Sequence, residues 1–133
     1  MRVDEPRTNL PRTEGGCHCG ALRFYVRTAK HELLRCNCSM CTKRGHLHLI
    51  VEADEFTLVC GQDDIGEYRF GTKVARHYFC KHCGITPFYV PRSHPQGFSV
   101  NFRCIDNFEE RIGDYEIRDF DGSKWEENID KIL

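Results

Sequence analysis

The sequence predicts an all-β domain of short strands, and three observations support this fold class. Seven short segments are rich in apolar, β-branched or aromatic residues, as strands typically are. Glycine, proline, asparagine or aspartate separates these segments, which indicates turns between them. Helical patterns are confined to two short stretches. The length of 133 residues suits a single domain.

The elements follow one another closely along the chain. Residues 1–12 hold two prolines and several charges, and they predict a flexible N-terminal lead-in. We expect the domain over residues 13–126 and a C-terminal tail over 127–133. The predicted strands are residues 21–26, 46–51, 56–60, 67–70, 75–79, 87–90 and 98–102. Residues 61–64 (GQDD) predict a hairpin-type turn, and residues 91–97 (PRSHPQG) predict a loop.

Two stretches favour helix. Residues 37–43 allow one or two turns. The tail over residues 123–132 has Ser123 followed by Glu126, which resembles a capping box, and Trp125, Ile129 and Ile132 recur at helical spacing. A short C-terminal helix is therefore predicted.

Charge and composition exclude several classes of partner. Nineteen basic and twenty acidic residues give a formal net charge of -1, so the sequence offers no electrostatic footprint for nucleic acid or an anionic membrane. Basic residues such as Lys43 and Arg44 are expected on the solvated surface. The polar first sixteen residues lack the apolar core of a signal peptide. We expect a cytoplasmic or nuclear, reducing compartment, where clustered cysteines favour metal binding over disulfides.

Two of the cysteine clusters are pairs separated by about sixty residues. Cys17 and Cys19 form a C-x-C, whose alternate side chains point to the same face of extended backbone. Cys80 and Cys83 form a C-x-x-C followed by Gly84, a turn that aims two sulfurs at one ion. The four thiolates together predict a structural zinc that clips the start of the domain to its later half.

The third cluster combines both spacings in six residues. Cys36, Cys38 and Cys41 in CNCSMC bring three sulfurs together locally, which leaves a zinc with an open position. Two alternatives stay open at this point: Cys17 and Cys19 could share an ion with two cysteines of this cluster, or a fourth ligand could complete the triplet. The candidates for such a fourth ligand are Cys60, Cys104, His46 and His48. Cys60 and Cys104 are expected to be buried small hydrophobic residues.

An open three-thiolate zinc favours the chemistry of thiols. The net charge of -1 on such a cluster acidifies bound water less than neutral imidazole ligands would. The soft site suits an incoming thiol, which binds, loses its proton to solvent or a nearby base, and attacks an electrophile as thiolate. Carbon–sulfur bond making or breaking is the predicted reaction type. The base is unknown, and the candidates are His46, His48 and His77, although single histidines on strands more often serve packing.

Three stretches carry a family resemblance: GGCHCGALRF, CNCSMC and FCKHCGITPFYVPRSHPQGFSVNFRCID. Over residues 13–126 the chain resembles the glutathione-dependent formaldehyde-activating enzyme family (the centromere protein V/GFA domain), and the stretch after Cys80 is most similar to the centromere protein V branch. The resemblance implies an Mss4-like fold of packed antiparallel sheets with zinc-bearing turns. It also implies two zinc ions: a structural one on Cys17, Cys19, Cys80 and Cys83, and a catalytic-type one on Cys36, Cys38 and Cys41.

The resemblance also implies an activity and partners. The family's name-giving reaction joins glutathione to formaldehyde and gives S-hydroxymethylglutathione, which is a carbon–sulfur lyase reaction in reverse. The implied partners are a small thiol such as glutathione and an aldehyde. Neither nucleic acid nor a membrane is expected as a partner, because of the balanced charge. The alternative is a non-catalytic zinc scaffold that binds a protein partner, as in the centromere protein V branch, or that forms a homo-oligomer.

Overall fold

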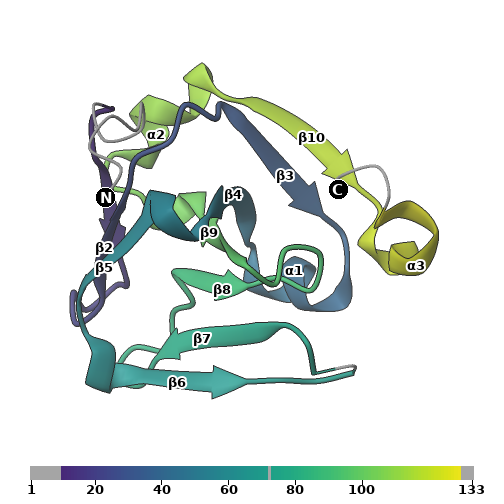
Figure 1. Ribbon diagram of the computed structural model, residues 1–133, viewed down its shortest axis with the longest axis horizontal. Coiled ribbons are helices and arrows are strands. Elements are labelled where there is room, and N and C mark those ends of the chain that lie inside the picture. Colours follow the sequence, from purple (N-terminus) through teal and green to yellow (C-terminus); the bar gives the residue numbers. More distant parts are fainter. Residues whose placement is uncertain (1–9, 72, 130–133) are drawn as a thin grey trace.

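The computed structural model describes residues 10–71 and 73–129, and these residues form two packed sheets (Figure 1). The smaller sheet has the strand order β1–β2–β5, with β1 at Thr13–Gly16, β2 at Arg23–Val26 and β5 at Phe56–Cys60. The larger sheet has the order β10–β3–β4–β9–β8–β7–β6. Its strands are β3 (Glu32–Cys36), β4 (Leu47–Glu52), β6 (Ile65–Tyr68), β7 (Arg76–Cys80), β8 (Phe88–Val90), β9 (Gly97–Asn101) and β10 (Glu116–Phe120).

All seven predicted strands are present, with ends that differ by at most two residues from the expected ones. Three further strands, β1, β3 and β10, were not predicted. The β1 sequence TEGG has two glycines and β10, EIRDF, has three charges, so neither carries the apolar pattern of a strand. The expected antiparallel sheets are present, with one parallel pair in the larger sheet, between β10 and β3.

The predicted hairpin-type turn at residues 61–64 is a turn, but it does not join a hairpin. The backbone N–H of Asp64 donates to the Gly61 carbonyl at 2.9 Å, and Gln62–Asp64 forms a 3₁₀ turn. The strands on its two sides, β5 and β6, lie in different sheets. Local composition predicts a change of chain direction but not which strand the chain pairs with next. The predicted loop over residues 91–97 does connect two paired neighbours, β8 and β9.

The helices are short. The first, α1, spans Ser39–Arg44 and ends one residue beyond the predicted region. The C-terminal helix, α3, spans Trp125–Asn128 after a 3₁₀ turn at Gly122–Lys124. A further helix, α2 (Phe108–Arg111), was not predicted. The predicted helical position Ile132 lies outside the described residues. Among the helices of the described ranges, none is long and apolar enough to cross a membrane.

The hydrophobic core lies between the two sheets. Phe24 of β2 and Phe56 of β5, both in the smaller sheet, stack with ring centroids 5.5 Å apart. Phe24 also meets Phe88 of the larger sheet edge-on at 6.3 Å. The core continues through buried side chains of β3, β4 and β9, among them Leu33, Leu49 and Val100. Burying such side chains drives folding, and the cysteine clusters lie at the rim of this core.

One edge of the larger sheet brings distant segments together. Because β3 and β10 run in parallel, both end at the same side, where Cys36 and Phe120 are register partners. Figure 1 shows the two strands side by side, with α1 following β3 and α3 following β10. The chain after β10 therefore passes over the start of α1, where the cysteine triplet is located.

Candidate functional site

The first cluster contains four sulfurs. The Sγ atoms of Cys17, Cys19, Cys80 and Cys83 all lie within 4.8 Å of one another. The Cys19 sulfur is 3.6 Å from the sulfurs of Cys17 and of Cys80. Tetrahedral zinc with Zn–S bonds of about 2.3 Å requires sulfurs about 3.8 Å apart, so this donor set fits the ion. The grouping that the sequence predicted is the one that the structure brings together.

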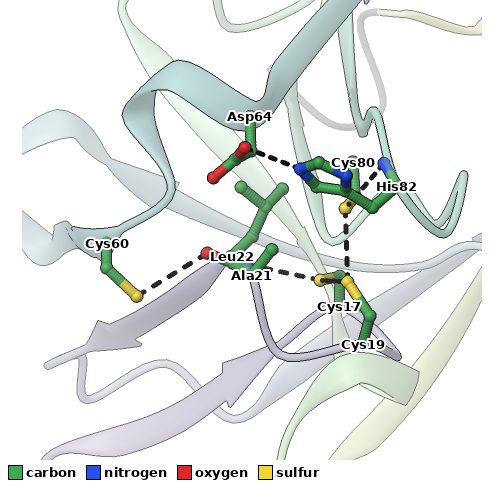
Figure 2. A network of polar contacts seen from close by, with 8 residues as sticks. All are labelled: Cys17, Cys19, Ala21, Leu22, Cys60, Asp64, Cys80 and His82. Carbon is green, nitrogen blue, oxygen red and sulfur yellow. Dashed lines mark hydrogen bonds and ion pairs between the residues drawn. The ribbon is translucent and has the colours of Figure 1, made fainter.

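Two similar turns hold this cluster. The backbone N–H of Leu22 donates to Cys17 Sγ at 3.3 Å, and that of His82 donates to Cys80 Sγ at 3.4 Å (Figure 2). The glycines that follow the cysteine pairs, Gly20 and Gly84, have φ values of +85° and +81°, a conformation that other residues rarely adopt. One turn follows β1 and the other follows β7, so the four sulfurs connect the smaller sheet to the larger one.

The second cluster contains three sulfurs. Cys36 ends β3, Cys38 is the N-cap of α1, and Cys41 is buried within α1. Their Sγ atoms also lie within 4.8 Å of one another. Cys38 Sγ accepts a hydrogen bond from the Cys41 N–H at 3.4 Å, and Cys36 Sγ accepts one from the Cys38 N–H at 3.5 Å. Hydrogen bonds from the thiols of Cys36 and Cys41 lower the pKa of Cys38 to about 2. The pKa of Cys36 is raised, mainly by its contact with the Cys38 sulfur, and that of Cys41 is raised by its contacts with the sulfurs of Cys36 and Cys38, so Cys38 is the first of the three to ionise.

The other two cysteines lie elsewhere. Cys60 was expected to be buried, but it is exposed on β5, where its thiol donates to the Ala21 carbonyl at 3.6 Å. Cys104 is partly buried, and its pKa is raised to about 12, first by burial and then by the negative charges of Cys17 and Cys83. Cys104 is thus near the four-sulfur cluster rather than the triplet.

His48 contacts the triplet directly. Its Nε2 lies 3.1 Å from Cys41 Sγ, and its Nδ1 lies 2.7 Å from the hydroxyl of Ser99. The same hydroxyl lies 3.2 Å from Nε2 of His46. When Cys41 is a thiolate, its sulfur accepts, so His48 carries its proton on Nε2 and accepts from Ser99 on Nδ1. Ser99 then accepts from His46 Nε2–H, and the buried Nδ1 of His46 has no partner among the described residues.

His77 lies between two aromatic rings. Its ring stacks on Tyr89 at 4.8 Å and on Phe70 at 5.3 Å. Arg44 donates from Nη2 to His77 Nδ1 at 2.9 Å, so the neutral ring carries its proton on Nε2. Burial lowers the pKa of His48 and of His77 to about 4, and the pKa of His46 falls well below its usual value for the same reason. All three imidazoles are therefore neutral near pH 7.

Three functional candidates were missed by the sequence: Arg44, Tyr89 and Ser99. Arg44 was expected on the surface, but its guanidinium lies 5.3 Å from the centre of the Tyr89 ring, and burial lowers its pKa. A signal existed for Arg44, since it follows Cys41 by three residues on the same helix and therefore shares its face. Ser99 pairs with Ile50 across β4 and β9, and the sequence contains no signal for that register.

The triplet lies between two cavities. One has a volume of about 690 Å³ and is lined by Cys36, Cys41 and His46 among others. The second, of about 480 Å³, is called the thiol pocket below, and all three cysteines of the triplet contribute to its wall. Its remaining lining residues are Leu34, Ser39, Met40, His48, Ile50, Phe70, Gly71, Ala75, His77, Tyr89, Pro91, Arg92, Ser93, Phe120 and Gly122.

The comparisons with known proteins agree with this geometry. Residues 12–119 match the family model described as glutathione-dependent formaldehyde-activating enzyme. The fold is similar to the crystal structure of a Rhodobacter sphaeroides protein from a structural genomics programme, with a TM-score of 0.69 and 30% sequence identity. That similarity covers 79% of this chain and 99% of the other one.

Proposed function

Because the chain belongs to the glutathione-dependent formaldehyde-activating enzyme family, we propose that it makes or breaks a carbon–sulfur bond between a small thiol and an aldehyde. The proposed site is a catalytic zinc on Cys36, Cys38 and Cys41. One observation carries the proposal: these three sulfurs form part of the wall of a cavity large enough for a small molecule. The cluster of Cys17, Cys19, Cys80 and Cys83 already has four donors, and we assign it a structural zinc.

The donor set defines what the triplet site offers. Zinc on three thiolates supplies a soft electrophilic position at which a thiol is acidified. His48 donates to Cys41 Sγ from Nε2 and thereby holds that thiolate in its orientation. The positive charge of Arg44 lies within electrostatic range of Cys41 and Cys38, so it offsets the negative charge of the cluster.

The reaction itself consists of the formation of one carbon–sulfur bond and the transfer of one proton. The thiolate sulfur gives an electron pair to the carbonyl carbon, the carbonyl π pair moves to oxygen, and that oxygen takes up the proton that the thiol lost. Cleavage is the reverse. With the tautomers described above, neither His48 nor His77 presents a free ring lone pair, and His46 lines the other cavity. We therefore assign these three histidines to orientation, and solvent water carries the proton.

The test uses protein whose triplet holds cobalt, because thiolate-to-cobalt absorption reports each bound sulfur. Addition of a small uncharged thiol such as 2-mercaptoethanol should increase this absorption, and this thiol together with formaldehyde should be turned over. Cys38→Ser should abolish both responses while circular dichroism stays native, and Cys60→Ser is the matched control because Cys60 lies on β5, away from the triplet. A spectrum that shows four protein sulfurs and never responds to thiols would contradict the proposal. Native folding and full metal content without turnover would favour the alternative, a zinc scaffold for a protein partner.

A further inference from the structure

The thiol pocket is mainly apolar. Its walls come from α1 and β3 on one side, from the β6–β7 hairpin on another, and from the segment after β10. Apolar and aromatic side chains dominate them: Leu34, Met40, Ile50, Phe70, Ala75, Tyr89, Pro91 and Phe120. Apart from the metal-binding cysteines, Arg92 is the one charged residue among the lining residues described. The ring nitrogens of the lining histidines, His48 and His77, contact Cys41 and Arg44 respectively.

The charges at this pocket cancel in pairs. A divalent zinc on three thiolates carries a net charge of -1, and the cation of Arg44 offsets it. Arg92 forms an ion pair with Glu126 of α3, through its Nη2 and the carboxylate Oε1. The Arg92 side chain is 29% exposed, so its charge is held partly out of solvent beside its partner. A carboxylate on a ligand would have to compete with Glu126 for this cation.

The segment that closes the pocket lies beyond the family match. The family model ends at residue 119, whereas Phe120, Gly122 and Glu126 follow that position. Phe120 and Gly122 line the pocket, and Glu126 pairs with its cation. This part of the wall is therefore not covered by the similarity that names the family, whereas the rest of the apolar wall lies within the matched residues.

We propose that the thiol accepted here has an uncharged, apolar body, and that glutathione is a poor ligand. The inference rests on the proposed thiol chemistry at the triplet and specifies its substrate class. Glutathione carries two carboxylates and an ammonium group besides its thiol. Burying these charges in an apolar pocket without free partners is costly, whereas a neutral hydrocarbon body gains by leaving water.

The first experiment compares thiols that differ in one property. Cobalt-loaded protein is titrated with 3-mercaptopropionate and with its methyl ester, and each dissociation constant is corrected for the pKa of the free thiol. We expect the ester to bind at least about tenfold more tightly than the acid. We also expect 2-phenylethanethiol to bind at least about tenfold more tightly than glutathione. Equal or tighter binding of the charged member of either pair would overturn the inference and leave the thiol reaction intact. If no thiol changes the spectrum, the proposed function fails, and this inference fails with it.

Variants of single residues identify which side chains of the pocket discriminate between thiols. Glu126→Gln should remove the carboxylate that competes for Arg92, so the affinity for 3-mercaptopropionate should rise about fivefold while that for the ester stays constant. Glu127→Gln is the matched control on the same helix. Phe70→Ala should weaken 2-phenylethanethiol about fivefold without affecting 2-mercaptoethanol, and Val74→Ala is its control, because Val74 is exposed near Phe70 and does not line the pocket. If Glu126→Gln and Phe70→Ala both behave like their controls, the pocket does not select the thiol and the inference is wrong.

Discussion

Substitution of Gly122 by alanine is the sharpest test of how the chain's C-terminal segment meets the triplet. A Cβ at this position would lie 2.3 Å from Cys36 Sγ and 2.9 Å from Cys38 Cβ. Non-bonded heavy atoms need about 3.5 Å or more, so either the segment or the Cys36 sulfur must move by about 1 Å. Changes in groups that position metal ligands typically cost tenfold to hundredfold in metal affinity. We therefore expect Gly122→Ala to weaken one of the two zinc ions by about tenfold to hundredfold, or about 1.4–2.8 kcal/mol.

Competition with a chromophoric chelator measures this effect, because it resolves a tight and a weak zinc in the same protein. Gly113→Ala is the matched control: no heavy atom lies within 4 Å of its Cβ position, and it also sits in a 3₁₀ turn. The melting temperature of Gly122→Ala should stay near that of the wild type, since the four-sulfur cluster is not touched. Unchanged zinc affinity together with an unchanged cobalt spectrum would refute the reasoning, because the segment would then not press on the sulfurs.

Three further predictions follow from the same structure. Cys83→Ser should remove one zinc per chain and lower the melting temperature strongly, because metal binding at the four-sulfur cluster is coupled to folding; calorimetry and metal analysis check this, with the exposed Cys60→Ser as control. Ser99→Ala should cost about 1–3 kcal/mol in urea unfolding, because two buried imidazoles lose their shared hydroxyl, and it should shift the cobalt–thiolate band by freeing His48; an unchanged band would contradict the orienting role of that histidine. The third concerns His77: its pKa is lowered, so the unfolded chain binds the proton first, and its contribution to stability falls as pH drops from about 6.5 to about 4. The stability difference between wild type and His77→Gln at saturating zinc should decline over that pH range, and a constant difference would rule this out.

Strands with an apolar pattern were predictable, and strands that owe their pairing to distant neighbours were not. The apolar and aromatic residues of the segment ALRFYV predict a strand over residues 21–26, and the observed strand, β2, begins only two residues after the predicted start. The segment EIRDF of β10 is mostly exposed, and it is a strand because its backbone pairs with β3. That pairing joins residues more than eighty positions apart, as between Arg35 and Asp119, whose side chains also form an ion pair at 2.7 Å. A local reading of the sequence carries no information about such a contact.

In the candidate site, too, features set by local sequence were predictable and contacts between distant segments were not. The grouping of the cysteines was predictable, because cysteine spacing restricts which sulfurs can converge on one ion. For the residues around these cysteines, the sequence predicted candidate side chains but not which atoms those side chains contact. His48 was one of several candidates for a base, and its actual partners, Cys41 and Ser99, depend on the register of α1 against β4 and of β4 against β9. Arg44 was expected on the surface, but it is half-buried because its guanidinium packs over the ring of Tyr89.

The two cysteine clusters use the same donor atom, sulfur. They differ in the fourth coordination position of a tetrahedral ion, which a cysteine fills in one cluster and a cavity borders in the other. At Cys17 and Cys80 the sulfurs come from turns of two different sheets, so an ion bound there would hold the two sheets together. At Cys36, Cys38 and Cys41 all three donors come from one turn, so the ion is not needed to join distant segments, and one side is left to a cavity. The proposed function thus assigns stability to one cluster and reactivity to the other. A chelator concentration that strips the weaker site should therefore leave a folded protein that no longer binds thiols, with its melting temperature nearly unchanged.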